Sequence, residues 1–332
     1  MILVTGAAGF IGSAMIWHLN TNQDSNILIS DKLKEGEKWL NISNLLYYDW
    51  IDRDDLFNFL ASTDLNITSV IHMGACSSTT ENDADFLMKN NYEYTKNLWK
   101  YCTEKQIAFI YASSAATYGN GENGYNDKLD LKSSEKLSPL NKYGYSKKIF
   151  DIWAMKQSKT PKRWYGLKFF NVYGPNEYHK DRMASMVFHA YNQFSIDKEV
   201  KLFKSYNKGY NDGEQLRDFI YVKDVVKIIS FMLENNFVES GIYNLGTGTS
   251  RTFYDLAKIT VDSMGGDESN IKFVSMPKDL RDKYQYFTEA NIDKLVKNGY
   301  TDELFTLESG IKDYVENYLL KKNKYLNLEE TI

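Results

Sequence analysis

The chain begins Met1-Ile-Leu-Val-Thr-Gly6-Ala-Ala-Gly9-Phe-Ile-Gly12, an apolar strand-like run that passes through three glycines into a helix-like segment. Gly6 allows a tight turn, Gly9 allows backbone N–H groups to approach a pyrophosphate, and Gly12 allows the helix to lie close to the sheet. A helix N-terminus also favours negative charge. The pattern therefore predicts a dinucleotide site, although its G-x-x-G-x-x-G spacing leaves an ordinary glycine-rich turn as the alternative.

Length and charge favour a large α/β protein with two domains. The 332 residues are about twice the usual length of one domain. The formal net charge is -4, and 25% of the residues are charged, with both signs interleaved. No Lys/Arg cluster longer than two residues precedes the tail at 321–324, so we do not expect nucleic acid as a partner.

The sequence indicates neither a targeting segment nor a metal site. The apolar run Met1 to Val4 is too short for a signal peptide core, and no window approaches roughly 18 apolar residues. We therefore expect a soluble cytoplasmic protein with no membrane partner. Cys76 and Cys102 fit no metal spacing and are expected to be reduced thiols, and the four histidines are scattered.

A second apolar strand, residues 26–31, ends in an acid 19 residues beyond Gly12. That acid, Asp31, stands where a Rossmann unit contacts the adenosine ribose, and a carboxylate there favours NAD. Several cations follow it, at Lys32, Lys34, Lys38 and Arg53. Such a cluster can neutralise a ribose 2′-phosphate and so favours NADP, and a solvated charged loop is the alternative.

Further strands and a helix follow the Rossmann pattern. Residues 69–76 read as a buried parallel strand that ends in a small-residue turn. Apolar residues at helical spacing predict an amphipathic helix through Thr95, Leu98, Trp99 and Cys102. Residues 108–119 form another strand with hydroxyls at Ser113 and Ser114, at the end where ligands bind in an open α/β sheet.

Tyr143 and Lys147 are four residues apart, so on a helix they share one face. A nearby ammonium and an oxidised nicotinamide should lower the pKa of the tyrosine from about 10 toward neutrality. The pair would then accept a proton from an alcohol that is being oxidised. Tyr145, two residues before Lys147, should face elsewhere.

Together these motifs resemble the extended short-chain dehydrogenase/reductase family. The likeness runs from residue 1 to about 320 and is closest to the epimerases of ADP-linked heptoses. The family-wide motifs are Thr5 to Gly12, Ser113 to Gly119 and Tyr143-x-x-x-Lys147. The more specific ones are Gly74 to Glu81, Tyr111 to Gly119, Phe170 to Pro175, His179-Lys180 with Met183-Ala-Ser185, and Arg217 to Val222.

The resemblance implies four catalytic residues and a bound NADP, with NAD as the alternative. Ser114 and Tyr143 would act on the reacting hydroxyl, Lys147 on the nicotinamide ribose, and Lys180 as a second acid/base. The implied cofactor-binding residues are Gly6, Gly9, Phe10, Ile11, Gly12, Asp31, Lys32, Lys38, Arg53, Gly74, Ala75, Cys76, Ser77, Asn90, Tyr143, Lys147, Val172 and Lys180. The implied substrate-binding residues are Ser114, Asn171, Arg182, His189, Phe203, Lys204, Ser205, Arg217 and Tyr284.

Three positions depart from the family pattern. Lys32 stands where Asn is expected, which adds a cation near the ribose. Met73 stands where an acid is expected, and Arg182 where a small hydroxyl residue is expected, close to the diphosphate.

The loop 205–215 is longer than usual and should be exposed. Another glycine turn, Gly246-x-Gly248, is more simply explained as a strand-to-helix connection than as a phosphate site.

We predict a Rossmann-type, doubly wound parallel sheet with a smaller, interleaved C-terminal substrate-binding domain. Residues 1–171 would bind the dinucleotide, with return segments near 219–247 that include a helix from Asp224 and a strand from Gly241. Residues 172–218 and 248–320 would bind the substrate, and 321–332 would be a frayed polar tail.

The implied activity is epimerisation at carbon 6 of an ADP-linked heptose, in the synthesis of lipopolysaccharide core precursors. The sugar would be oxidised to a 6-ketone and reduced again, with no net redox change. Alternatives are a nucleotide-sugar dehydratase or reductase, and a catalytically silent dinucleotide-sensing protein on the same fold. Against dehydration, Ala115 and Ala116 follow Ser114 where an acid would be needed. The resemblance also implies a homo-oligomer, with a pentamer as the expected form.

Overall fold

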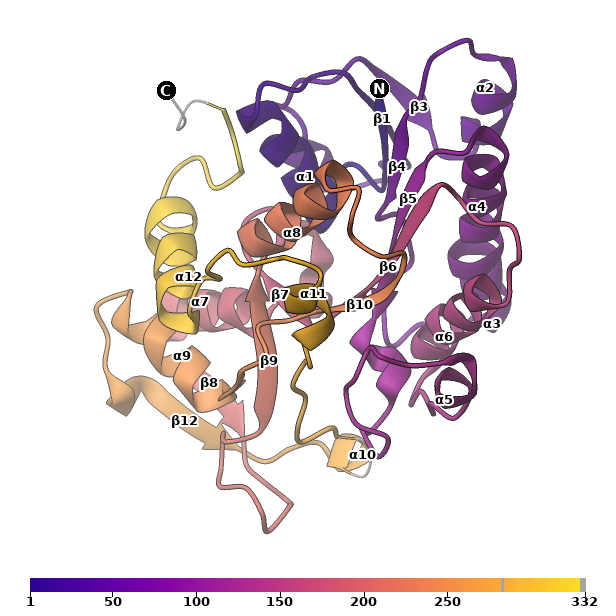
Figure 1. Cartoon of the computed structure of the whole chain (residues 1–332). Helices are drawn as coiled ribbons and strands as arrows, with labels where there is room; N and C mark the ends of the chain where they lie inside the picture. Colours follow the sequence, from indigo (N-terminus) through magenta and orange to yellow (C-terminus); the bar gives the residue numbers. More distant parts are fainter. Residues whose placement is uncertain (282–283, 329–332) are drawn as a thin grey trace.

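The computed structural model describes residues 1–281 and 284–328 (Figure 1). Its centre is a seven-stranded sheet in the order β10-β6-β5-β4-β1-β2-β3, with every neighbouring pair parallel. The order reverses at β1, as in a doubly wound Rossmann sheet, which confirms the predicted fold class. The strands are β1 (Ile2–Thr5), β2 (Ile27–Asp31), β3 (Asp49–Asp52), β4 (Ser69–His72), β5 (Ala108–Ser114), β6 (Arg163–Phe169) and β10 (Gly241–Leu245).

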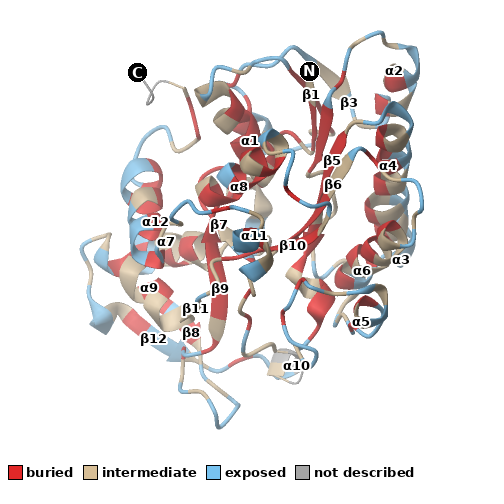
Figure 2. Cartoon of the chain, viewed as in Figure 1, coloured by how far each residue is buried: buried red, intermediate tan, exposed pale blue. Residues whose placement is uncertain are grey.

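Helices cover both faces of this sheet, as Figure 1 shows. Successive residues of a strand point to opposite faces, so Leu3 and Val4 of β1 enter different cores. Val4 packs in the core that contains α1 (Phe10–Thr21) and α8 (Val222–Glu234). Leu3 packs in the core that contains α2 (Leu56–Ser62), α4 (Tyr94–Lys105) and α6 (Lys142–Met155). In Figure 2 the central strands are almost entirely buried.

A second group of elements lies beside the carboxyl ends of the sheet. It contains the three-stranded sheet β11-β9-β7 and the pair β12-β8. Its strands are β7 (Asn171–Tyr173), β8 (Val200–Phe203), β9 (Leu216–Tyr221), β11 (Ser250–Thr252) and β12 (Ile271–Val274). Its helices are α7 (Met186–Asp197), α9 (Phe253–Asp262) and α12 (Leu307–Tyr314). Short helices elsewhere are α3 (Ala84–Leu87), α5 (Leu131–Glu135), α10 (Lys278–Arg281) and α11 (Asp293–Lys297).

Most elements begin where the sequence predicts, but three ends differ. The strand predicted over 69–76 stops at His72, and the strand predicted over 108–119 stops at Ser114, where a short 3-10 helix begins. Hydroxyl side chains favour such breaks because they bond to nearby backbone groups: Ser114 Oγ accepts a hydrogen bond from the N–H of Ala116 at 3.1 Å. The return near 219 is also corrected, because residues 219–221 belong to β9 outside the main sheet, and the return begins with α8.

The prediction of a frayed tail is wrong for residues 324–327, which the structure holds against the rest of the chain. Leu326 is 1% exposed, and its backbone N–H donates to Asn176 Oδ1 at 3.0 Å. The indole N–H of Trp17 donates to the carbonyl oxygen of Asn327 at 3.0 Å. The buried Leu326 and these hydrogen bonds hold the segment; the rest of the predicted tail, 329–332, lies outside the described residues. Within the described chain, no helix is long and apolar enough to cross a bilayer.

Candidate active site

The glycine-rich turn and the turn after β4 lie against each other. Gly6 has a φ of +68°, and a Cβ there would lie 2.4 Å from the backbone nitrogen of Gly74. A Cβ on Gly12 would lie 2.1 Å from the carbonyl oxygen of Gly6. Helix α1 begins at Phe10, and no side chain of the described residues caps its first turn. Its N–H groups therefore remain available to an anion, which fits the pyrophosphate of a dinucleotide.

Asp31 lies at the end of β2 and holds the glycine-rich turn. Its side chain is buried, and it accepts hydrogen bonds from the N–H of Ala8 at 2.9 Å and from Lys38 Nζ at 2.7 Å. This carboxylate therefore lies next to the start of α1, where a Rossmann site reads the ribose. Lys38 is the predicted cation that the structure brings closest to it.

Two of the other predicted cations, Lys32 and Arg53, gather on a different acid, Asp54. Lys32 and Arg53 both bind its carboxylate, and Arg53 also donates to Asn90 Oδ1. Lys34 is exposed. The structure thus brings Lys32, Arg53 and Asn90 together beyond β2 and β3, with Lys32 and Arg53 already paired with Asp54.

The reacting groups lie where β5 and α6 meet. Ser114 ends β5, and Tyr143 and Lys147 lie one turn apart on α6. The cap of α6 is Asn141, whose side chain accepts a hydrogen bond from the N–H of Gly144 at 2.8 Å. Lys147 Nζ donates to the carbonyl oxygen of Ala112 at 2.8 Å, which fixes the ammonium beside the strand end.

The predicted lowering of the pKa of Tyr143 is not what the protein alone produces. Burial raises the pKa of its hydroxyl, and a hydrogen bond with Ser114 lowers it only in part. Burial also lowers the pKa of Lys147 to about 8, so the same desolvation weakens the ammonium that was expected to favour the phenolate. Tyr145 is 54% exposed, so it faces away as predicted.

The turn after β4 is held by Asn91, a residue that the sequence analysis missed. Its Oδ1 accepts the N–H of Cys76 at 2.8 Å, and its Nδ2 donates to the carbonyl oxygen of Cys76 at 3.0 Å and to Ser146 Oγ at 3.1 Å. Asn91 lies in a π-helical turn, Met88–Glu93. That extra residue in the helix rotates Asn91 inward, and no periodic pattern in the sequence signals it.

Lys180 lies close to Phe10, the first residue of α1. It lies in a short 3-10 helix, Tyr178–Met183, with its Nζ 5.2 Å from the ring centre of Phe10. Burial lowers the pKa of Lys180, and the buried carboxylate of Glu177 raises it. Arg182, two residues further on, is exposed.

Arg217 is buried in β9 rather than paired on the surface. Its guanidinium donates to the carbonyl oxygens of Leu216, at 2.8 Å, and Gln285, and lies 5.4 Å from the ring centre of Tyr284. The carboxylate of Asp218 points elsewhere and accepts N–H groups of Thr247 and Gly248. The glycine turn at 246–248 is therefore held by that acid, and it connects strand β10 to the short strand β11, not directly to a helix as predicted.

The remaining predicted substrate residues lie on the second group of elements. Asn171 is exposed at the start of β7, beside the half-buried Val172, and His189 is half-buried on α7. Phe203 ends β8, and Lys204 and Ser205 follow it. Most of the loop 205–215 is exposed, as predicted, although Gly213 and Gln215 are buried. Among the residues described, no three His, Cys, Asp or Glu side chains gather in a way that could hold a metal ion.

The doubly wound sheet, the glycine turn against an uncapped helix, and hydroxyl and lysine side chains at the strand ends define the class of extended short-chain dehydrogenases/reductases. Comparison with known proteins narrows this class. The sequence model of the NAD dependent epimerase/dehydratase family matches residues 2–246, and the chain belongs to that family.

Relatives resemble the chain over almost its whole length. A protein of Fusobacterium nucleatum named ADP-L-glycero-D-manno-heptose-6-epimerase is 60% identical, over 98% of this chain and all of that protein. A protein of the same name from Nitratidesulfovibrio vulgaris is 46% identical with the same coverage. The crystal structure of the Helicobacter pylori ADP-L-glycero-D-manno-heptose-6-epimerase has 31% identity and a TM-score of 0.78, over 95% of both chains.

Proposed function

We propose that this protein is an isomerase that epimerises carbon 6 of an ADP-linked heptose, from ADP-D-glycero-D-manno-heptose to ADP-L-glycero-D-manno-heptose. The observation that carries the proposal is the 60% identity, over 98% of the chain, to a relative that bears the name of this activity. The geometry of the strand ends supports it, because Tyr143 lies on α6 and Lys180 lies over Phe10, the first residue of the helix that follows the glycine turn.

The first proton-transfer group is Tyr143. Ser114 orients the reacting hydroxyl, Tyr143 takes its proton, and Lys147 favours the phenolate and binds the nicotinamide ribose. The bound dinucleotide supplies the acceptor and donor of hydride. Since the protein alone raises the pKa of Tyr143, the phenolate needs charge that arrives with the cofactor.

The second proton-transfer group is Lys180. Hydride enters and leaves from one fixed side, so the sugar carbon must turn over between the two transfers and its oxygen occupies two positions. One base cannot easily serve both. Lys180 lies over Phe10 on another element, and its burial favours the neutral amine that a base requires.

The dehydratase alternative is less well supported. Expulsion of hydroxide needs an acid close to the hydroxyl at the strand end. Ala115 and Ala116 follow Ser114, so neither of the next two side chains is an acid. The backbone N–H of Ala116 donates a hydrogen bond to Ser114 Oγ at 3.1 Å. A silent dinucleotide-sensing protein would not need the Tyr143 and Lys147 pair, which is present on one face of α6.

We also propose NADP as the preferred cofactor, a cytoplasmic location and a homo-oligomer, with a pentamer as the expected form. Lys32 and Arg53, at the ends of β2 and β3, and Lys38, which binds Asp31 at the end of β2, support the first of these. Light scattering on the purified protein measures the oligomer; a monomeric mass would contradict it.

The proposed function is tested with purified protein and ADP-D-glycero-D-manno-heptose. We expect the L-glycero isomer as product, bound NADP(H) seen by its absorbance, and no consumption of added NADPH. Net consumption of NADPH would identify a reductase. Loss of water from the sugar would identify a dehydratase, and no conversion of either isomer would refute the proposal.

A further inference from the structure

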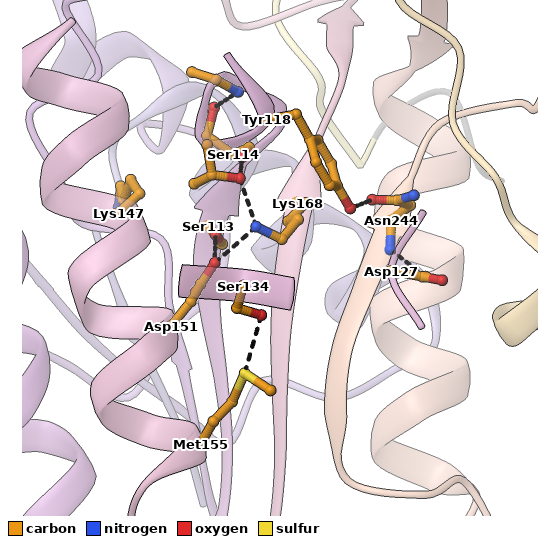
Figure 3. Close-up of polar contacts among 12 residues, drawn as sticks. Ser113, Ser114, Tyr118, Asp127, Ser134, Lys147, Asp151, Met155, Lys168 and Asn244 are labelled. Carbon is orange, nitrogen blue, oxygen red and sulfur yellow. Dashed lines mark hydrogen bonds and ion pairs between the residues drawn. The ribbon is translucent and has the colours of Figure 1, made fainter. Parts of the chain in front are cut away.

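A buried ion pair lies beneath the reacting residues and has no part in the roles described so far. Asp151 Oδ2 of α6 and Lys168 Nζ of β6 are 2.9 Å apart, with side chains 3% and 1% exposed. In Figure 3 both side chains point toward the end of β5. Replacing such a pair by apolar side chains is often neutral or stabilising, so stability alone does not explain its presence.

Asp151 binds two side chains of β5. Its Oδ1 accepts a hydrogen bond from Tyr111 Oη at 3.0 Å, and its Oδ2 accepts one from Ser113 Oγ at 2.7 Å. Gly166 of β6 makes room for the first bond, because a Cβ there would lie 2.3 Å from Tyr111 Oη. The carboxylate thus fixes the strand immediately before Ser114.

Lys168 fixes the chain immediately after Ser114. Its Nζ also donates to Thr117 Oγ1, which in turn donates to the carbonyl oxygen of Ser114 at 2.8 Å. The ammonium lies 4.8 Å from the ring centre of Tyr118. The two members of the pair therefore hold the backbone on both sides of the serine (Figure 3).

The same pair is continuous with the catalytic face of α6. Tyr143, Lys147 and Asp151 follow one another at intervals of four residues, so they share one face of the helix. Lys147 donates to the carbonyl oxygen of Ala112, between the two β5 residues that bind Asp151. Any shift of Asp151 would move helix and strand relative to each other.

Asp151 also acts on Lys147 and Tyr143 through its charge. Burial lowers the pKa of Lys147, and Asp151 and Cys76 raise it. Asp151 and Cys76 likewise raise the pKa of Tyr143, whereas the hydrogen bond with Ser114 lowers it. On the neighbouring β4, the buried His72 is neutral, since burial and the charge of Lys147 lower its pKa to about 3.

We propose that Asp151 and Lys168 are positioning residues of the active site. The pair fixes the backbone on both sides of Ser114, and the Asp151 carboxylate keeps the Lys147 ammonium charged beside Tyr143. The kinetic part of this inference rests on the proposed function.

The main test is Asp151→Asn, which keeps the size of the side chain and removes its charge. Without that charge the pKa values of Lys147 and Tyr143 both fall, so both limbs of the pH profile of kcat should move to lower pH. Loss of position should lower kcat at least about tenfold while KM stays within about twofold. Asp151→Glu, which keeps the charge, should retain the wild-type profile.

A second readout needs neither substrate nor cofactor. Tyrosinate absorbance is titrated against pH, and the same titration of Tyr143→Phe is subtracted to isolate Tyr143. In the Asp151→Asn background the Tyr143 component should titrate at lower pH than in wild type. A matched control is Asp313→Asn, since Asp313 also pairs with a lysine, Lys223, at 2.7 Å and accepts a tyrosine hydroxyl, but lies on α12. It should leave the pH profile and the Tyr143 component unchanged.

Asp151→Asn leaves the buried Lys168 ammonium without its carboxylate partner, and the variant can fail to fold for that reason. In that case the double variant Asp151→Asn/Lys168→Met, which also removes the ammonium, should show the same shifts of the pH profile and of the Tyr143 titration. Activity that falls at all pH values, with both limbs and the Tyr143 titration unmoved, would reduce the pair to a structural role and overturn the inference. A wild-type protein that does not convert ADP-heptose would instead refute the proposed function, and the tyrosinate titration would still decide the electrostatic part.

Discussion

Lys180→Met tests whether epimerisation uses two bases. The side chain lies over the ring of Phe10, with Nζ 5.2 Å from the ring centre, and it is half-buried. Methionine has a similar length and apolar stem, so it should fill the same space while removing only the amine. The expected consequence is loss of one proton transfer and little change in substrate binding.

The size of the effect follows from the environment of Lys180. Burial lowers its pKa, and Glu177, which is fully buried and accepts hydrogen bonds from Ser185 Oγ at 2.7 Å and from Gly174, raises it. The amine therefore can lose its proton at a lower pH than a free lysine. General acid–base catalysis contributes about 10²–10⁴-fold, so kcat should fall by that factor, equivalent to about 3–5 kcal/mol of barrier.

The assay separates the two halves of the reaction. Deuterium exchange between carbon 6 of the sugar and the bound nicotinamide is measured for each isomer. The isomer whose oxygen faces Tyr143 should still exchange, and the other should not. Lys201→Met, at an exposed lysine of β8, is the control and should behave as wild type. Normal turnover of both isomers with a raised KM would refute the two-base mechanism and leave Lys180 as a binding residue.

Three further predictions concern cofactor, substrate and pH. The double variant Lys38→Ala/Arg53→Ala should weaken the binding of NADP at least about tenfold more than the binding of NAD, since a charge-assisted contact contributes about 1.5–3 kcal/mol. A binding titration with each cofactor measures this, and equal losses of affinity would contradict contact with the 2′-phosphate. Arg217→Lys should raise KM for the sugar nucleotide, because a point charge replaces a bidentate fork, and an unchanged KM would exclude a diphosphate contact. The buried His72 has its pKa lowered to about 3, so its neutral form stabilises the fold above the unfolded pKa of 6.5, and this stability is lost as the pH falls. At about pH 5 the loss is about 2 kcal/mol of unfolding free energy. When urea unfolding is measured at pH 7 and pH 5, the free energy of unfolding should therefore fall less for His72→Asn than for wild type. An equal fall in both proteins would contradict this role of His72.

Much of the fold could be predicted because its signals are local. The turn from β1 into α1 requires glycine at positions where a Cβ would strike backbone, so the three-glycine pattern marks it in the sequence. The buried face of α4 was read directly from helical spacing: Thr95, Leu98, Trp99 and Cys102 are its buried residues. Tyr143 and Lys147 share a face for the same reason.

Local signals failed where a partner distant in the sequence decides the outcome. Leu326 docks on Asn176, 150 residues away, so a segment with a polar composition is held instead of fraying. β9 forms a separate sheet because β7 and β11 pair with it, and its own sequence reads like any buried strand. The cations after β2 are distributed between Asp31 and Asp54, and only the fold shows which cation binds which acid.

The sequence by itself determined the Rossmann order of elements, the glycine turn and the spacing of the Tyr143 and Lys147 pair, because each depends on backbone geometry within a few residues. Only the tertiary structure decided how those groups are held and charged. Asp151 binds Tyr111 of β5, which lies 40 residues earlier in the chain, and Lys168, which lies 17 residues later. Asn91 turns inward because its helix contains one extra residue. Burial of charge and the pairing of distant side chains depend on what surrounds them in space, which no local pattern records.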